Sequence, residues 1–144
     1  MPFIINDHID LCLSINADGM HVGGTDKSVA EVRAIIGPDK ILGSSCYGDL
    51  ALAHAAQAAG ASYVAFGGFY PSKVKKYPVT TAPTIVSDWK AQGKVPSCVI
   101  GGMNKENSAP LVANGADMVA AISSVYLAGD PQAAARAFVN LFPT

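Results

Sequence analysis

Short apolar segments alternate with helix-like segments from one end of the chain to the other. Six of the apolar segments are four to six residues long, rich in Val, Ile, Met or Phe, and free of charged residues. Uninterrupted runs of this length are typical of strands that are buried on both faces of a parallel sheet. The predicted strands are Phe3–Asn6, Met20–Gly23, Ile41–Ser45, Tyr63–Gly67, Ser97–Gly101 and Met118–Ser123.

Helix start and stop signals lie between these strands. Ser28 and Glu31 have the spacing of a capping box before a helix over 29–36, which ends at Gly37. Asp49 is a candidate cap for the next helix, and Gly60 closes it. Further helices are predicted over 9–15, from Pro83 to Gly93, from Asn104 to near Gly115, and from Asp130 to about Leu141.

A short pattern recurs where a predicted helix ends and a strand begins. A small residue before a buried strand suits a tight loop, because Gly and Asn adopt the left-handed conformation easily. The recurrence indicates βα repetition without a domain boundary, so we expect one domain over 1–144. The three copies are Asn16-Ala17-Asp18-Gly19-Met20, Gly60-Ala61-Ser62-Tyr63-Val64 and Gly115-Ala116-Asp117-Met118-Val119.

About six βα units fit either a doubly wound open sheet or part of an eight-stranded barrel. The Rossmann fingerprint is missing, since Asp7-His8-Ile9-Asp10 follows the first strand in place of a glycine loop. Polar residues follow the predicted strands, and in a βα barrel the loops at the carboxyl ends of the strands carry the reaction. This placement favours an α/β fold of TIM-barrel-like (β/α) repeats.

Composition narrows the class of protein further. The 144 residues have a net charge of −1, and 15% of them are charged, against about 25% in an average soluble domain. This balance excludes a disordered chain and offers no basic face for nucleic acid. No apolar run approaches the roughly 18 residues of a membrane span, and the first residues lack a signal-peptide pattern. Three widely spaced cysteines, Cys12, Cys46 and Cys98, predict reduced, packed thiols in a cytoplasmic protein.

Two acidic residues follow the first two predicted strands. Asp7 and Asp26 are candidate ligands for one Mg²⁺ ion, which typically takes one or two carboxylates and leaves its other positions to water and phosphate. The ordinary alternatives are that Asp7 caps the helix over 9–15 and that Asp26 is a solvated loop residue. Spacing alone leaves both interpretations open.

Later strand ends offer anion-binding features. Gly101-Gly102 before a helix, with Ser123-Ser124 at the next strand end, is a place where barrels commonly hold phosphate. A tight turn that needs glycine explains the same residues equally well. Lys73, Lys75 and Lys76 beside Ser72 are either solvated surface or a clamp for diphosphate.

The remaining histidine, serine and cysteine residues do not predict a further catalytic site. His21 lies inside a predicted strand and is expected to be a hydrogen-bonded core residue. The segment 43–47 lacks the final glycine of a nucleophile elbow, which disfavours a serine hydrolase. Cys46 has no identifiable base, so packing is the better interpretation of this thiol.

Six segments, taken in order, resemble the thiamin phosphate synthase family and, more loosely, the related thiazole tautomerase. They span nearly the whole chain, and their order makes the resemblance specific. The segments are Ile4-Ile5-Asn6-Asp7, Ala17-Asp18-Gly19-Met20-His21-Val22-Gly23 with Asp26, Gly43-Ser44-Ser45, Gly67-Gly68-Phe69-Tyr70-Pro71-Ser72 with Lys75, Ile100-Gly101-Gly102-Met103, and Ile122-Ser123-Ser124.

The resemblance implies an eight-stranded barrel that joins an aminopyrimidine methyl diphosphate to a hydroxyethylthiazole phosphate. Such a transferase releases diphosphate and forms thiamin phosphate. By resemblance, Asp7 and Asp26 look like Mg²⁺ ligands. The residues that look like diphosphate contacts are Asn6, Ser45, Ser72 and Lys75, of which Ser45 and Lys75 are the catalytic candidates; Gly101, Gly102, Ile122 and Ser123 look like the phosphate cradle for the thiazole.

The chain also departs from the family pattern. Val74 stands where a hydroxyl is typical, His8 where Arg is common, and Gly24-Thr25 where Gln-Glu is usual. Met1 falls at the family's third strand, so the first two βα units are absent and six units cannot close an eight-stranded ring. The low surface charge and the two bare edges predict a homo-oligomer, a dimer in the simplest case, that covers the open sides.

Three functions remain open at this point. A thiamin phosphate synthase is implied first. A phosphate-binding remnant without activity is favoured by Val74 and by the missing units. A thiazole tautomerase is disfavoured by the pair Asp7 and Asp26, because an isomerisation needs no metal site for diphosphate.

Overall fold

The computed structural model describes residues 1–24, 27–71 and 80–144. Six strands form one parallel sheet in which each strand pairs with the next along the chain. A doubly wound sheet would reverse its strand order, so this order excludes that alternative and confirms the barrel-like repeat. The strands are β1 (Ile4–Asn6), β2 (Gly19–Val22), β3 (Ile41–Tyr47), β4 (Tyr63–Phe66), β5 (Ser97–Ile100) and β6 (Met118–Ala120).

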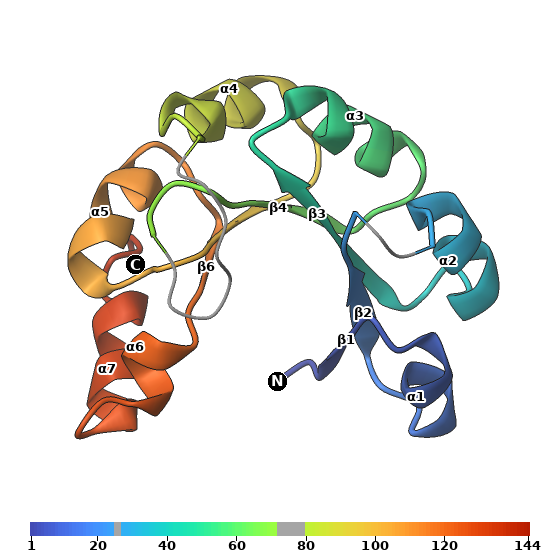
Figure 1. Cartoon of the computed structure of the whole chain (residues 1–144), viewed down its shortest axis with the longest axis horizontal. Helices are drawn as coiled ribbons and strands as arrows, with labels where there is room; N and C mark the ends of the chain where they lie inside the picture. The colour runs from blue at the N-terminus through green and yellow to red at the C-terminus, as the bar shows by residue number, and fades with distance from the viewer. Residues whose placement is uncertain (25–26, 72–79) are drawn as a thin grey trace.

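The sheet curls like part of a barrel wall. Figure 1 shows the helices on the convex side of the sheet, with β1 and β6 at the two ends of the arc. No helix in the three described ranges has the length and apolar character needed to cross a membrane. The helices are α1 (Ile9–Ser14), α2 (Val29–Ile36), α3 (Leu50–Ala58), α4 (Thr84–Gln92), α5 (Lys105–Ala113), α6 (Ser123–Tyr126) and α7 (Pro131–Val139).

Most predicted helix starts are confirmed at the level of single hydrogen bonds. Ser28 and Glu31 form the expected capping box at the start of α2. The Asp49 carboxylate accepts from two backbone N–H groups of α3, and the Asp130 carboxylate accepts from Ala133 N at the start of α7. Each cap satisfies donors that the first turn of a helix would otherwise leave unpaired.

The last strand is shorter than predicted. β6 ends at Ala120, opposite Ile100, the last residue of β5. Beyond that pair no further ladder partner exists on β5, and the backbone closes its hydrogen bonds locally in the short helix α6. The predicted strand over 118–123 is therefore wrong in its last three residues, and Ser123 begins a helix.

The recurring pattern before the strands has a structural cause. Asp18, Ser62 and Asp117 each precede a strand, and each side chain accepts the backbone N–H of a residue in or just before the neighbouring strand. The donors are Phe3, Leu42 and Ser97, at distances of 2.7, 3.0 and 2.9 Å. These side chains tie the amino ends of adjacent strands together.

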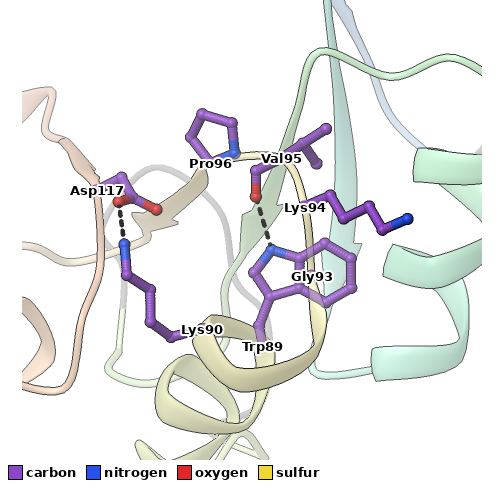
Figure 2. A pocket seen from close by; sticks show the side chains of 7 residues that line it. All are labelled: Trp89, Lys90, Gly93, Lys94, Val95, Pro96 and Asp117. Carbon is purple, nitrogen blue, oxygen red and sulfur yellow. Dashed lines mark hydrogen bonds and ion pairs between the residues drawn. The ribbon is translucent and has the colours of Figure 1, made fainter.

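A pocket of about 260 Å³ also lies at the amino ends, beside the start of β5. Figure 2 shows the Trp89 indole donating to Val95 O and the Lys90 ammonium paired with Asp117. Burial raises the pKa of Asp117, but the hydrogen bonds and charge of Lys90 and the Ser97 N–H outweigh it and bring that pKa below its usual value. The polar groups at this end are engaged in holding α4 against β5 and β6.

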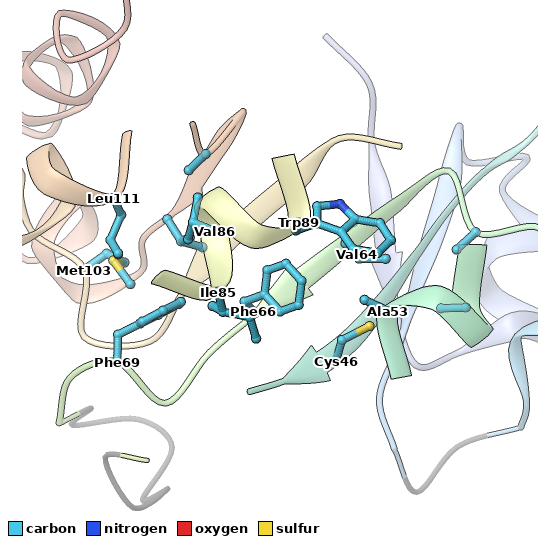
Figure 3. Packing of buried hydrophobic residues seen from close by; sticks show 14 residues of the cluster. Cys46, Ala53, Val64, Phe66, Phe69, Ile85, Val86, Trp89, Met103 and Leu111 are labelled. Atoms are coloured by element: carbon cyan, nitrogen blue, oxygen red, sulfur yellow. The ribbon is translucent and has the colours of Figure 1, made fainter. Parts of the chain in front are cut away.

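The main hydrophobic core lies between the sheet and its helices. Phe66 of β4 and Trp89 of α4 pack edge to face with their ring centroids 6.1 Å apart, at the centre of the cluster in Figure 3. A second cluster joins β1 to β3 with α1 and α2. All three cysteines are buried and free, which confirms packed thiols, and burial raises the pKa of Cys46 to about 11.

Candidate active site

The concave face of β2 to β4 carries a hydrogen-bonded chain of side chains. In the sheet register His21 lies opposite Gly43, which lies opposite Tyr63. The His21 ring is 2.8 Å from Ser45 Oγ through Nε2 and 2.9 Å from the Tyr63 hydroxyl through Nδ1. All three side chains are half-buried, whereas the alternate residues Met20 and Val64 are buried in the core. His21 is thus hydrogen-bonded, as predicted, but the prediction that it belongs to the core is wrong, because it is half-buried outside both core clusters and contacts the predicted catalytic residue Ser45.

Asn6 is the last residue of β1, where it lies opposite His21 in the register, and Asp7 follows it. The Asn6 amide donates to Asp7 Oδ2 at 2.9 Å, and Asp7 N donates to His21 O at 2.9 Å. Asp7 has a φ of 69°, a left-handed conformation that costs a non-glycine residue about 1 kcal/mol. The N-cap of α1 is His8, without a side-chain cap, so the alternative that Asp7 caps this helix is wrong.

The predicted partner of Asp7 cannot be placed beside it, because Asp26 lies outside the described residues. Within residues 1–24, 27–71 and 80–144, no three His, Cys, Asp or Glu side chains group closely enough to hold a metal ion. Asp7 itself is exposed and presents hard oxygen donors beside the Asn6 amide. Its donor chemistry suits Mg²⁺, which often takes a single carboxylate.

The glycine pair after β5 forms a tight turn. Gly101 and Gly102 have φ values of 98° and 63°, and a side chain on Gly102 would overlap Pro71 O. Asn107 holds this turn by donating from its amide to Gly102 O at 2.8 Å. The turn interpretation is confirmed, and a role in binding phosphate stays a prediction.

The glycine turn and the start of α6 are joined to each other. Ser124 Oγ donates to Met103 O at 2.6 Å, which links the residues after β5 to those after β6. Ile122 is exposed and Ser123 is half-buried beside this link. The structure therefore brings Gly101, Gly102, Ile122 and Ser123 into one neighbourhood, at the other end of the arc from Asn6 and Asp7.

The connection from β4 to α4 is held at both of its described ends. Thr81 Oγ1 donates to Gly67 O at 2.6 Å, and Thr80 N and Thr81 N donate to Gly68 O. The Tyr70 hydroxyl donates to Asn107 O at 2.9 Å. The predicted site residues Ser72 and Lys75 lie between these anchors and outside the described residues.

Sequence reasoning missed Tyr63 as part of the site. Strand periodicity places Gly43 and Ser45 on one face, and a glycine two positions before a serine was the available signal for a large neighbour. The strand that supplies this neighbour follows only from the sheet order. Tyr47 was also missed, and its hydroxyl accepts from Gly24 N at 2.9 Å.

Comparisons with known proteins show which proteins this chain is similar to. The family model described as thiamine monophosphate synthase matches residues 1–125. The thiamine-phosphate synthase of Janthinobacterium sp. (strain Marseille) is 94% identical over 142 residues, which are 99% of this chain and 69% of that protein. That of Nitrosomonas eutropha is 46% identical over 99% of this chain and 67% of its own length.

Solved structures give the same result. Thiamine phosphate pyrophosphorylase from Pyrococcus furiosus superposes with a TM-score of 0.83 at 28% identity, covering 97% of this chain and 66% of its own. The 3-hexulose-6-phosphate synthase of Salmonella typhimurium, at 20% identity and a TM-score of 0.67 over 92% of this chain and 65% of its own, shows the shared fold alone. The chain spans about two thirds of the length of these relatives.

Proposed function

Because the chain belongs to the thiamine monophosphate synthase family, we propose that it is a transferase that makes thiamin phosphate. The substrates are hydroxymethylpyrimidine diphosphate and hydroxyethylthiazole phosphate. The bond from the pyrimidine methylene carbon to the diphosphate oxygen breaks, and a bond from that carbon to the thiazole nitrogen forms. The observation that carries this function is the 94% identity to a thiamine-phosphate synthase over 99% of the chain.

We assign binding of the diphosphate to residues that lie in or follow strands β1 to β4 along the chain. Asp7 and Asp26 would hold Mg²⁺, and the ion would supply positive charge to offset the negative charge of the diphosphate. Asn6 orients the Asp7 carboxylate through the amide hydrogen bond, and Ser45 donates its hydroxyl to a phosphate oxygen. Ser72 and Lys75 add a hydroxyl and a positive charge by their match to the family pattern.

The second half of the arc takes the thiazole phosphate. The Gly101-Gly102 turn exposes backbone without side chains, and Ser123 lies beside it through the link from Ser124 to Met103. Gly101, Gly102, Ile122 and Ser123 form the cradle. Holding the nitrogen nucleophile near the methylene carbon makes the transfer effectively unimolecular, and that positioning accounts for much of the catalysis.

The first experiment asks for turnover by the chain as it stands. Purified protein is incubated with both substrates and Mg²⁺, and thiamin phosphate is measured by fluorescence after oxidation. We expect product that disappears when Mg²⁺ is chelated. An exposed control variant, Asp10→Asn in α1, should behave as wild type.

The same samples separate the synthase from a phosphate-binding remnant. The second candidate is a phosphate-binding remnant without transferase activity, which Val74 favours because it stands where the family pattern has a hydroxyl. Absence of product together with calorimetric binding of the thiazole phosphate would overturn the transferase and select the remnant. Isomerisation of a thiazole substrate without any transfer would select the tautomerase.

We further propose that residues 1–144 form one partial-barrel domain that works as a dimer in the cytoplasm. Large apolar side chains are exposed near both ends of the arc, including Phe3 at one end and Leu127 at the other. Within the described chain β1 and β6 each pair with a single strand, so each keeps an edge that a second copy can cover. Light scattering after size exclusion tests this, and a monomer at micromolar concentration contradicts it.

A further inference from the structure

The hydrogen-bonded chain Tyr63–His21–Ser45 joins residues of three strands that are far apart in sequence. Ser45 accepts or donates at His21 Nε2, and the Tyr63 hydroxyl meets Nδ1 of the same ring. The His21 and Tyr63 rings also lie against each other, with centroids 5.6 Å apart. Both ring nitrogens of His21 are therefore engaged, which restricts the orientation of the ring.

Gly43 leaves the space in the sheet that the three hydrogen-bonded side chains occupy. A Cβ atom on Gly43 would overlap the Tyr63 ring and its hydroxyl, and would also meet His21 Nδ1. Gly43 is buried between the two strands that supply these rings. The absence of a side chain at 43 is what allows tyrosine and histidine to meet across an intervening strand.

The direction of these hydrogen bonds depends on which ring nitrogen of His21 carries the hydrogen, and a protonated phenol is able to donate to the other one. Burial, and next the neighbouring Cys98 thiol, raise the pKa of Tyr63 to about 12, so its hydroxyl keeps its proton at neutral pH. A neutral imidazole donates from one nitrogen and accepts at the other. If Tyr63 donates to Nδ1, then Nε2 carries the hydrogen and donates to Ser45 Oγ. The hydroxyl hydrogen of Ser45 is then left for another acceptor.

We propose that Tyr63 and His21 are positioning residues that hold the Ser45 hydroxyl as a hydrogen-bond donor to a phosphate oxygen of the diphosphate. This inference rests on the proposed contact between Ser45 and that group. The reverse tautomer would make Ser45 donate to His21 and present only lone pairs to an anion. Tyr63 thus acts on the ligand through two intervening side chains.

The tautomer of His21 can be measured directly in the full chain. Nitrogen-15 NMR of the wild-type imidazole, without ligand at neutral pH, should show His21 with its hydrogen on Nε2. Tyr63→Phe removes the donor to Nδ1 and should produce a mixture of tautomers. Tyr126→Phe, which changes an exposed tyrosine, is the matched control and should leave the spectrum of His21 unchanged. A wild-type His21 with its hydrogen on Nδ1 would overturn the proposal.

Binding supplies the second readout. Calorimetry with inorganic diphosphate and Mg²⁺ should show affinity about 3- to 10-fold weaker for Tyr63→Phe, with Tyr126→Phe equal to wild type. His21→Gln, whose amide can still donate to Ser45, should bind more tightly than His21→Leu. Equal affinities for Tyr63→Phe and Tyr126→Phe, with both variants folded by circular dichroism, would contradict the positioning role.

Failure of the proposed function looks different. A wild-type chain that makes no thiamin phosphate but loses diphosphate affinity on Tyr63→Phe keeps the positioning role and discards the transferase. A chain that binds no diphosphate contradicts the assigned contact of Ser45 and this role together. With turnover present, the positioning role predicts that Tyr63→Phe raises KM for the pyrimidine diphosphate and leaves KM for the thiazole phosphate unchanged.

Discussion

The two ends of the parallel sheet are built differently. At the amino ends, the side chains of Asp18, Ser62 and Asp117 accept backbone N–H groups and so link each strand to its neighbour. At the carboxyl ends, Asp7 and the Gly101-Gly102 turn adopt positive φ values, and Asn6 and Asp7 are exposed. Hydrogen bonds that link adjacent strands thus lie at one end and exposed polar side chains at the other, a division between structural and functional ends that βα barrels generally show.

Arg33 illustrates the amino end most clearly. Its guanidinium donates to three backbone carbonyls, those of Gly37, Lys40 and Gly60, and also reaches Ser62 Oγ. The planar fork of five N–H donors suits several acceptors at once. One side chain of α2 thereby holds the loops that lead into β3 and β4.

The largest expected effect comes from the charge at the carboxyl end. Asp7→Asn keeps a side chain that tolerates the left-handed conformation but removes a Mg²⁺ ligand. We expect the rate of thiamin phosphate formation to fall about 100-fold or more, while the free energy of unfolding stays within about 0.5 kcal/mol. Steady-state kinetics and urea unfolding measure the two quantities. A variant with wild-type kinetics would remove Asp7 from the site.

The reverse pattern is expected for Arg33→Met. Methionine preserves much of the apolar stem but loses every hydrogen bond of the guanidinium, so the free energy of unfolding should fall by about 2–3 kcal/mol. The midpoint of urea unfolding reports this loss. Arg33→Lys keeps the charge but loses the planar guanidinium, so its free energy of unfolding should lie between those of wild type and Arg33→Met. Turnover per folded molecule should remain that of wild type. A large fall in turnover would contradict the assignment of a purely structural role to this side chain at the amino ends of the strands.

Asp7→Gly sharpens the contrast within the carboxyl end. Glycine adopts a φ of 69° without strain, so we expect a gain of about 0.5 kcal/mol in the free energy of unfolding together with loss of activity. The same substitution at Asp10, inside α1, should instead destabilise the protein by about 0.5–1 kcal/mol. Destabilisation by both variants would show that the backbone at Asp7 stores no strain.

The smallest effect concerns pH at the amino end. The folded pKa of Asp117 is lowered, so its contribution to stability is present above the unfolded pKa of about 3.9 and is lost as pH falls through the folded pKa. Asp117→Asn should remove this acid-dependent part. The pair with Lys90 is largely exposed and screened, so the change is about 0.5 kcal/mol or less. Thermal unfolding from pH 2 to pH 7 measures it, and Lys90→Met should act in the same direction.

Much of this architecture could be predicted from local patterns. The six strands, the capping box of Ser28 and Glu31, and the caps Asp49 and Asp130 depend on neighbours within a few residues. The position of Asn6 and Asp7 at the carboxyl end of a strand follows from the same reasoning. The end of β6 did not, because it depends on where β5 stops.

The amino-acid sequence by itself determined the βα repeat, the family and the polar character of the strand ends, because apolar period and capping act over short distances along the chain. Only the tertiary structure decided that Tyr63, His21 and Ser45 meet. Tyr63 is 42 positions and Ser45 is 24 positions from His21 in the sequence, and the sheet register brings them together. It also decided the left-handed backbone of Asp7, which lies where the chain leaves β1 with its N–H bonded to His21 O on β2. Contacts between strands are set by the order and register of the whole sheet, and no local pattern contains that information.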